Sequence, residues 1–172
     1  MKKVLSALAT IFVAAQLHAG LDGYFQLAMF APGEMPAPSY TINGARLSLI
    51  YGDCHELNGL DVSVVGSVRE RMCGLQLGAL WNDVGTDAYG LQIGCVNDVA
   101  GDIEGLQIAL LNIGGILHGC QIGLANFTNT DAVGCQIGIF NYTDNLYGCQ
   151  IGLINYVDSR SCCVLPIINI GW

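Results

Sequence analysis

Eight cysteines are the side chains best suited to covalent or metal chemistry in this chain of 172 residues. An even number of cysteines suggests disulfides in an exported protein. Four of them occupy the second position of a recurring unit, typically GCQIGxxN, where other copies read GLQIGxxN. Because cysteine replaces leucine there, we expect small, buried apolar side chains. The eight are Cys54, Cys73, Cys95, Cys120, Cys135, Cys149, Cys162 and Cys163.

Two alternatives for the cysteines stay open. One is a stacked column of thiols for redox chemistry or a soft metal, and the other is a set of disulfides. Cysteines at the margins of the repeats are the better disulfide candidates, and these are Cys54, Cys73, Cys162 and Cys163. No C-x-x-C spacing occurs, so the sequence lacks the usual signature of zinc ribbons and thioredoxin-like proteins.

Glutamine occupies the third position of six units and is the second candidate for function. Stacked amides can hydrogen-bond along a parallel ladder, which would be a structural role. Alternatively, glutamine and the fifth-position glycine form a shallow outward face that binds an extended partner, such as a glycan or a protein. We take this outward face as the predicted binding surface. Its residues are Gln76, Gln92, Gln107, Gln121, Gln136 and Gln150.

Other polar side chains indicate structure more than catalysis. The asparagine that closes each unit is expected to bond turn backbone. Aspartates between the units could hold Ca²⁺, but they lack the calcium-binding β-roll pattern, so a solvated acidic edge is favoured. His55 and His118 have no partner at a telling spacing, and no nucleophile elbow, phosphate loop or metalloprotease helix is present. The sequence therefore predicts a non-enzymatic protein without a cofactor.

The spacing of the units predicts the elements that position these columns. Units begin at positions 44, 59, 74, 90, 105, 119, 134, 148 and 162, which are 14 to 16 residues apart. Apolar residues alternate with Gln and Gly inside each unit, so each unit carries a strand with one apolar face. A parallel solenoid makes all units equivalent and explains why the same residues recur at the same offset. We predict an all-β parallel β-solenoid of about nine coils with an N-terminal cap strand. The alternative is an antiparallel outer-membrane β-barrel.

Three regions are predicted along the chain. Residues 1–19 resemble a signal peptide, with Lys2 and Lys3 before a short apolar core. Residues 20–43 form the cap strand and a Pro-rich connection, and residues 44–172 form the repeat array. Without residues 1–19 the chain has 4 Arg against 14 Asp and Glu, a net charge of −10. This charge argues against nucleic acid as a partner, and the 52% hydrophobic content argues against a disordered chain.

The units resemble a family of short bacterial surface repeats of roughly fifteen residues, found in exported proteins. The resemblance covers residues 44–169, and the segments QLAMFAPGEM and LPIINIGW also look like the ends of such proteins. It implies a location at the cell surface or envelope and no known catalytic residues. We therefore expect an exported repeat scaffold that binds a surface ligand or protein. The alternatives are an outer-membrane barrel, which would associate with the outer membrane, and a secreted metal-binding or enzymatic protein.

Overall fold

The computed structural model describes residues 23–28, 41–161 and 163–172; the predicted signal peptide and most of the Pro-rich connection lie outside this part. The described residues form strands, turns and bends only, and none of their segments is a membrane-spanning helix. The strands are β1 (Gly23–Ala28), β2 (Thr41–Cys54), β3 (Glu56–Val68), β4 (Met72–Val84), β5 (Ala88–Ile93), β6 (Val96–Val99), β7 (Asp102–Ile108), β8 (Leu111–Gly114), β9 (Ile116–Ile122), β10 (Ala125–Ile137), β11 (Phe140–Val157) and β12 (Val164–Gly171).

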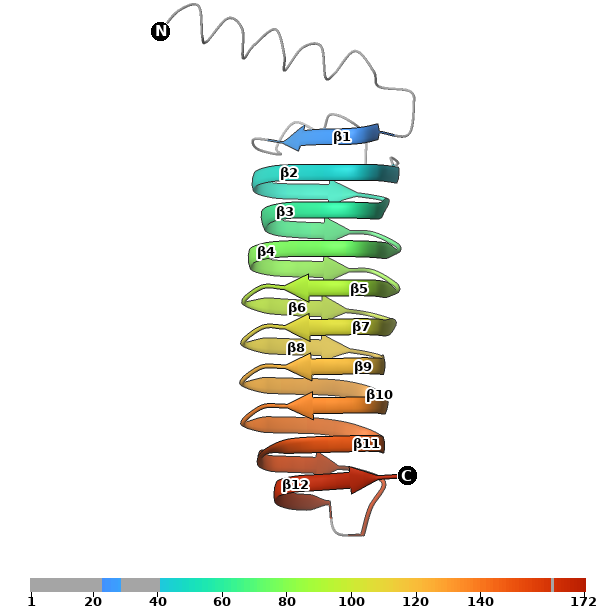
Figure 1. Cartoon of the computed structure of the whole chain (residues 1–172), viewed down its shortest axis with the longest axis vertical. Helices are drawn as coiled ribbons and strands as arrows, with labels where there is room; N and C mark the ends of the chain where they lie inside the picture. The colour runs from blue at the N-terminus through green and yellow to red at the C-terminus, as the bar shows by residue number, and fades with distance from the viewer. Residues whose placement is uncertain (1–22, 29–40, 162) are drawn as a thin grey trace, which may run out of the picture.

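The chain winds into a parallel β-solenoid, as predicted (Figure 1). Each strand pairs with the equivalent strand of the next coil, and the register places like residues on like residues. Between β10 and β11, for example, Gly134 lies beside Gly148, and Gln136 lies beside Gln150. This translational register excludes the antiparallel barrel. Eight aligned glycines, from Gly44 to Gly148, bound seven full turns.

The first glycine of each unit is required by the backbone. All eight of these glycines have φ between 126° and 154°, a region that side chains disfavour. A Cβ atom on Gly134 would overlap the carbonyl oxygen of Gly119 in the preceding coil. The glycine column therefore lets successive coils approach at this bend.

Both ends of the stack differ from the repeating coils. β1 pairs in parallel with β2 and covers the N-terminal end. At the other end, β12 turns back and pairs antiparallel with β11. The prediction of a ninth coil, starting at position 162, is therefore wrong. That unit begins with cysteine, whereas every coil begins with a glycine at positive φ.

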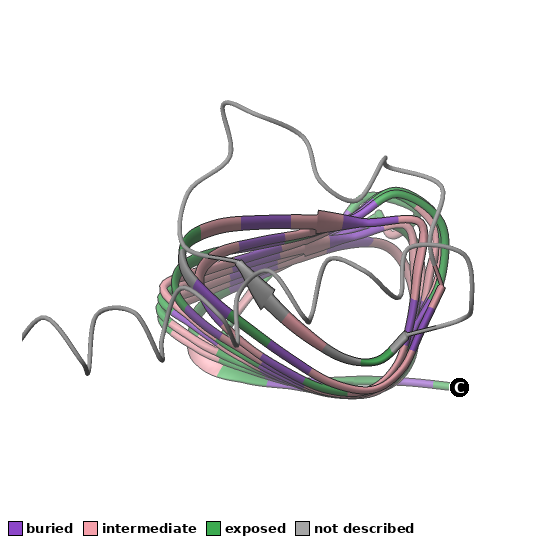
Figure 2. Cartoon of the chain, turned by 90° about the horizontal axis from the view of Figure 1, so that it is seen from above, coloured by how far each residue is buried: buried purple, intermediate pink, exposed green. Residues whose placement is uncertain are grey.

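The apolar core comes from positions outside the GLQIG motif. Residues two places before each first glycine point inward, among them Leu57, Met72 and Leu117. A second buried row lies two places after the asparagines; it is apolar at Val84 and Val99 and polar at Thr128 and Thr143. Buried and exposed positions alternate along each coil (Figure 2). The interior thus has an apolar part and, beside it, a polar part that the motif supplies.

Candidate functional site

The six glutamines lie inside the solenoid and form one continuous ladder. Each is at most 1% exposed. Each side-chain Nε2 donates to the Oε1 of the glutamine one coil earlier, over 2.7 to 2.9 Å from Gln92 to Gln150. The expectation that these side chains face outward is therefore wrong, and the alternative of stacked amides is confirmed. In this structure the glutamines cannot contact an external ligand.

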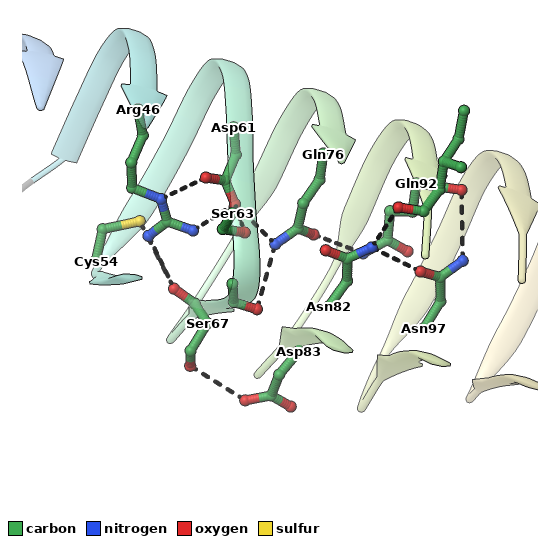
Figure 3. Close-up of polar contacts among 12 residues, drawn as sticks. Arg46, Cys54, Asp61, Ser63, Ser67, Gln76, Asn82, Asp83, Gln92 and Asn97 are labelled. Atoms are coloured by element: carbon green, nitrogen blue, oxygen red, sulfur yellow. Dashed lines mark hydrogen bonds and ion pairs between the residues drawn. The ribbon is translucent and has the colours of Figure 1, made fainter. Parts of the chain in front are cut away.

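A buried ion pair closes the N-terminal end of the glutamine ladder (Figure 3). Gln76 donates to Oδ2 of Asp61 over 3.3 Å. Arg46 donates to both oxygens of the same carboxylate, from Nε over 2.8 Å and from Nη2 over 2.6 Å. Its Nη1 donates to the carbonyl of Ser67. Arg46 and Asp61 occupy the glutamine position of their own coils. The same column therefore contains amide side chains in the later coils and charged side chains in the first two.

The electrostatics of this end favour a charged arginine. Burial alone would lower the pKa of Arg46, but the hydrogen bond to Asp61 and nearby negative charge raise it overall. Cys54 lies next to the guanidinium, and burial raises the pKa of its thiol to about 11, so it stays protonated at neutral pH. Because the Cys54 thiol is neutral, it does not compensate the charge of Arg46. Asp61 is the counter-ion of Arg46.

The C-terminal hairpin closes the other end of the ladder. Asn169 in β12 lies opposite Gln150 and donates to its Oε1 over 3.2 Å. Arg160 then donates to Oδ1 of Asn169 over 2.9 Å. All amides of the column therefore point the same way, with their donor ends toward Asp61 and their acceptor ends toward Arg160. Aligned amide dipoles between an anion and a cation strengthen one another.

A second ladder, made of asparagines, runs in the opposite sense. From Asn82 to Asn141, each Nδ2 donates to the Oδ1 of the asparagine one coil later, over 2.8 to 3.0 Å, and Asn155 is the last acceptor. Most of these amides also donate to a backbone carbonyl near the bend of a neighbouring coil; Asn126, for example, donates to Ile137. The predicted role of asparagine in bonding turn backbone is confirmed. The fifth-position glycines pack against this ladder: a Cβ on Gly138 would lie 2.7 Å from Nδ2 of Asn126.

Buried polar atoms without a partner occur near the N-terminal coils. Among the residues described, Oε1 of Gln26, Oγ of Ser48 and Oδ1 of Asn82 are buried and accept or donate no hydrogen bond. Gln26 lies beside Arg46 in the pairing of β1 with β2, so it belongs to the glutamine column. The repeat motif does not identify Gln26, because the first unit that matches it begins at Gly44. Only the pairing of β1 with β2 and of β2 with β3 shows that Gln26 lies in the same column, two strands before Asp61.

The apolar side chains of the motif point outward instead of inward. The fourth position is exposed in several coils, with Ile93, Ile122, Ile137 and Ile151 between 36% and 41%. The residues at the following bend are exposed further, with Leu80, Leu110, Leu124, Ile139 and Leu153 between 50% and 67%. We call these nine residues the aliphatic face. The apolar face that the sequence predicts for each repeat strand is therefore on the outside of the coil, and the glutamine face is on the inside.

The residues that directly follow the asparagines form another column. Its side chains are acidic in some coils and aromatic in others. In the N-terminal half it carries acids, and Asp83 lies beside Asp98. Burial and the charge of Asp83 raise the pKa of Asp98. In the C-terminal half the column becomes aromatic, and the rings of Tyr142 and Tyr156 stack at 5.4 Å. Each tyrosine hydroxyl donates to an aspartate two residues on, as in the bond from Tyr142 to Asp144.

Within the described ranges no three His, Cys, Asp or Glu side chains are grouped as a metal site.

Three of the repeat cysteines form an outward column. Cys120, Cys135 and Cys149 lie in register on adjacent coils. All three are partly exposed, so the expectation of buried cysteines is wrong for this column. Sγ of Cys149 lies 3.0 Å from Sγ of Cys135. Cys163 lies elsewhere, in the turn before β12, where its Sγ is 2.8 Å from the carbonyl oxygen of Arg160.

Comparison with known proteins returned no matching family model, no curated relative and no similar solved structure. The resemblance to bacterial surface repeats therefore stays a prediction that rests on the motif alone.

Proposed function

We propose that this protein is an exported, non-enzymatic repeat scaffold of the bacterial cell surface or envelope. The observation that carries the proposal is the pair of continuous amide ladders inside the solenoid. Their members are satisfied only while neighbouring coils stay stacked, since each side chain's partner belongs to another coil. A buried amide that loses its partner costs about 1–3 kcal/mol. The ladders therefore favour a stiff rod of fixed length over a body that opens to admit a substrate.

Charge and exposure support a scaffold rather than a catalyst. Arg46 and Asp61 are the only charged residues within the eight motif segments that begin at Gly44 to Gly148, and both are buried in their ion pair. The other acids among the described residues lie outside these segments. The aliphatic face is thus an exposed, regular surface, which suits contact with another macromolecule better than chemistry on a small molecule.

Export is tested by fractionation of cells that express the whole chain. A matched chain that lacks residues 2–19 is the control. We expect the whole chain in the envelope or the medium, shortened by about nineteen residues in its intact mass, because a signal peptide is removed on export. The control should stay in the cytoplasm. Recovery of the whole chain in the cytoplasm with Lys2 and Lys3 retained would overturn the proposal of export.

The aliphatic face also favours a second role, self-association of the scaffold through this face. A second copy is the best fit because both surfaces then carry the same ridges, spaced by about 4.8 Å per coil. The aliphatic face covers six coils, from the coil of Leu80 to the coil of Leu153. Six coils span about 29 Å and a six-residue strand spans about 20 Å, which gives roughly 580 Å² for each partner. The total of about 1,200 Å² lies at the lower end of the range for specific interfaces. An anionic lipid surface fits less well, since the mature chain would carry a net charge of −10.

Self-association is tested by substitution of one exposed leucine and one exposed isoleucine of the aliphatic face. Light scattering of purified protein should show a dimer that strengthens as salt screens the acidic charge. The variant Leu124→Glu with Ile139→Glu should be a monomer that keeps its β spectrum. Asn129→Glu with Thr130→Glu adds the same charge at two exposed positions of β10, outside the aliphatic face, and should remain a dimer. A monomeric parent protein, or one that instead floats with phosphatidylcholine vesicles, would overturn this role.

A further inference from the structure

The thiols of Cys120, Cys135 and Cys149 form an isolated three-membered column on the outside of the solenoid. Leu106 precedes them in the register, and Ile170 of β12 follows Cys149. The column therefore contains one central thiol, Cys135, with a thiol on either side. This arrangement differs from a paired disulfide framework because the central cysteine has a cysteine in register on each side.

The geometry brings neighbouring sulfurs within reach of a covalent bond. Cys135 and Cys149 are direct partners in the pairing of β10 with β11, and their Sγ atoms lie 3.0 Å apart. Adjacent strands lie about 4.8 Å apart, which falls inside the range of Cα separations of about 4.4–6.8 Å that disulfides span. Both side chains are partly exposed, so a reagent in solution can reach them.

The thiols need a reaction partner before they bond. Burial and the neighbouring cysteines raise the pKa of Cys135 to about 12, and burial raises that of Cys120. At neutral pH these two are therefore thiols rather than thiolates, and a thiolate is the nucleophile in exchange. Bond formation consequently requires a disulfide donor and should accelerate as pH rises.

We propose that Cys135 and Cys149 form a reversible disulfide that staples two adjacent coils, and that Cys120 is the exchange partner of this bridge. In the first step one of the two thiols loses its proton and attacks a sulfur of a small-molecule disulfide, which releases one donor thiolate. The second protein thiol then loses its proton and attacks the protein sulfur of the mixed disulfide, which releases the other donor thiolate. The donor is reduced to two thiols, and the two cysteines are oxidised to one disulfide.

The three-thiol column then allows the bridge to move by one coil. The thiolate of Cys120 attacks the sulfur of Cys135, the bond from Cys135 to Cys149 breaks, and Cys149 leaves as a thiolate that takes up a proton. No net oxidation occurs in this step. Cys120 and Cys149 are two coils apart, about 9.6 Å by strand spacing, so they cannot bond directly. Only the pairs that include Cys135 are allowed.

The chain offers a direct assay because aspartates separate the three cysteines. Cleavage before Asp102, Asp131, Asp144 and Asp158 places them in different peptides, 102–130, 131–143 and 144–157. The purified protein is treated with glutathione disulfide, its remaining thiols are alkylated with N-ethylmaleimide, and it is denatured, cleaved and weighed without reduction. We expect peptide 131–143 linked to 144–157, with a loss of two alkylatable thiols, and full recovery of both thiols after dithiothreitol.

Three single variants distinguish this column from general thiol reactivity. Cys120→Ser should keep the link between 131–143 and 144–157. Cys149→Ser should move the link to 102–130 and 131–143. Cys135→Ser should abolish both, leaving Cys120 and Cys149 alkylated, and circular dichroism checks that each variant keeps its β structure. A link between 102–130 and 144–157 in the Cys135→Ser variant, or full alkylation of the parent protein after treatment with the donor, would overturn the proposal.

Discussion

Arg46 and Asp61 form a two-pronged ion pair inside the solenoid, and each occupies the position that glutamine holds in later coils. Both side chains are fully buried. The pair gives the first amide of the ladder, Gln76, an anionic acceptor. It therefore acts as an end group for a column of hydrogen bonds, and its effect depends on both partners being present.

Removal of one partner should be much worse than replacement of both. Arg46→Gln leaves the Asp61 carboxylate buried without its counter-ion, and we expect a loss of about 3–5 kcal/mol in the free energy of unfolding. The double variant Arg46→Gln with Asp61→Gln extends the amide ladder and offers a donor to the unpartnered Oε1 of Gln26. We expect its stability to match or exceed that of the parent. Urea denaturation measures both, and a double variant as unstable as the single one would contradict this account.

An interruption in the middle of the ladder should destabilise the whole rod. Gln107→Leu removes the acceptor of Gln121 and the donor to Gln92. Each amide group left unpaired costs about 1–3 kcal/mol. Leu106→Gln is the control, because it places an amide at the neighbouring, half-exposed position and should change stability by less than about 0.5 kcal/mol. Equal effects of the two substitutions on the urea midpoint would refute the internal ladder.

The first glycine of a unit should resist substitution. Gly134→Ala places a methyl group at φ 134° and against the carbonyl of Gly119. We expect a loss of at least about 1–3 kcal/mol, the usual cost of a backbone held in a disfavoured region. Thermal unfolding measures the effect. A change within error of that of Asn129→Ala, a substitution at an exposed position of β10 where its register shifts, would show that the coils do not pack through this glycine.

The acidic column predicts a pH dependence that runs opposite to that of a salt-bridged carboxylate. The pKa of Asp98 is raised in the folded state by burial and by Asp83. The unfolded chain therefore loses this proton first as pH rises above about 4, and the contribution of Asp98 to stability falls through the window up to its folded pKa. Asp98→Asn should raise the melting temperature at pH 7 and have little effect at pH 3. The same increase at both values would argue against a charge effect.

The repeat spacing predicted the solenoid because translation is the only arrangement in which every coil needs the same residues at the same offset. It did not predict which side of each strand is inside. Alternation defines two faces, and the apolar side chains of the motif, such as Ile137, suggested the wrong one. The interior already receives its apolar side chains from other positions, such as Leu117 and Leu146. Gln136 therefore occupies the part of the interior that these apolar side chains leave free. There its amide bonds to the glutamines of the neighbouring coils instead of to water.

A signal for the correct orientation was present outside the motif. Position two before each first glycine is apolar in every coil, including Ile42, Leu57 and Met72, whereas the other positions between units vary. The end of the array was also readable, since the last unit has Cys162 where the others have glycine. The cap formed by Asn169 on the ladder was not readable, because it depends on a change from parallel to antiparallel pairing.

The burial of the glutamine ladder is tested most directly by hydrogen exchange of the side-chain amides. Protein comprising residues 20–172, labelled with ¹⁵N on glutamine, contains seven glutamines, of which six belong to the ladder. NMR in deuterium oxide follows each Nε2 group. We predict that Gln76, Gln92, Gln107, Gln121, Gln136 and Gln150 exchange far more slowly than free glutamine, because their amides are buried and bonded. Exchange of these six at the rate of free glutamine, in protein that remains folded, would contradict the account.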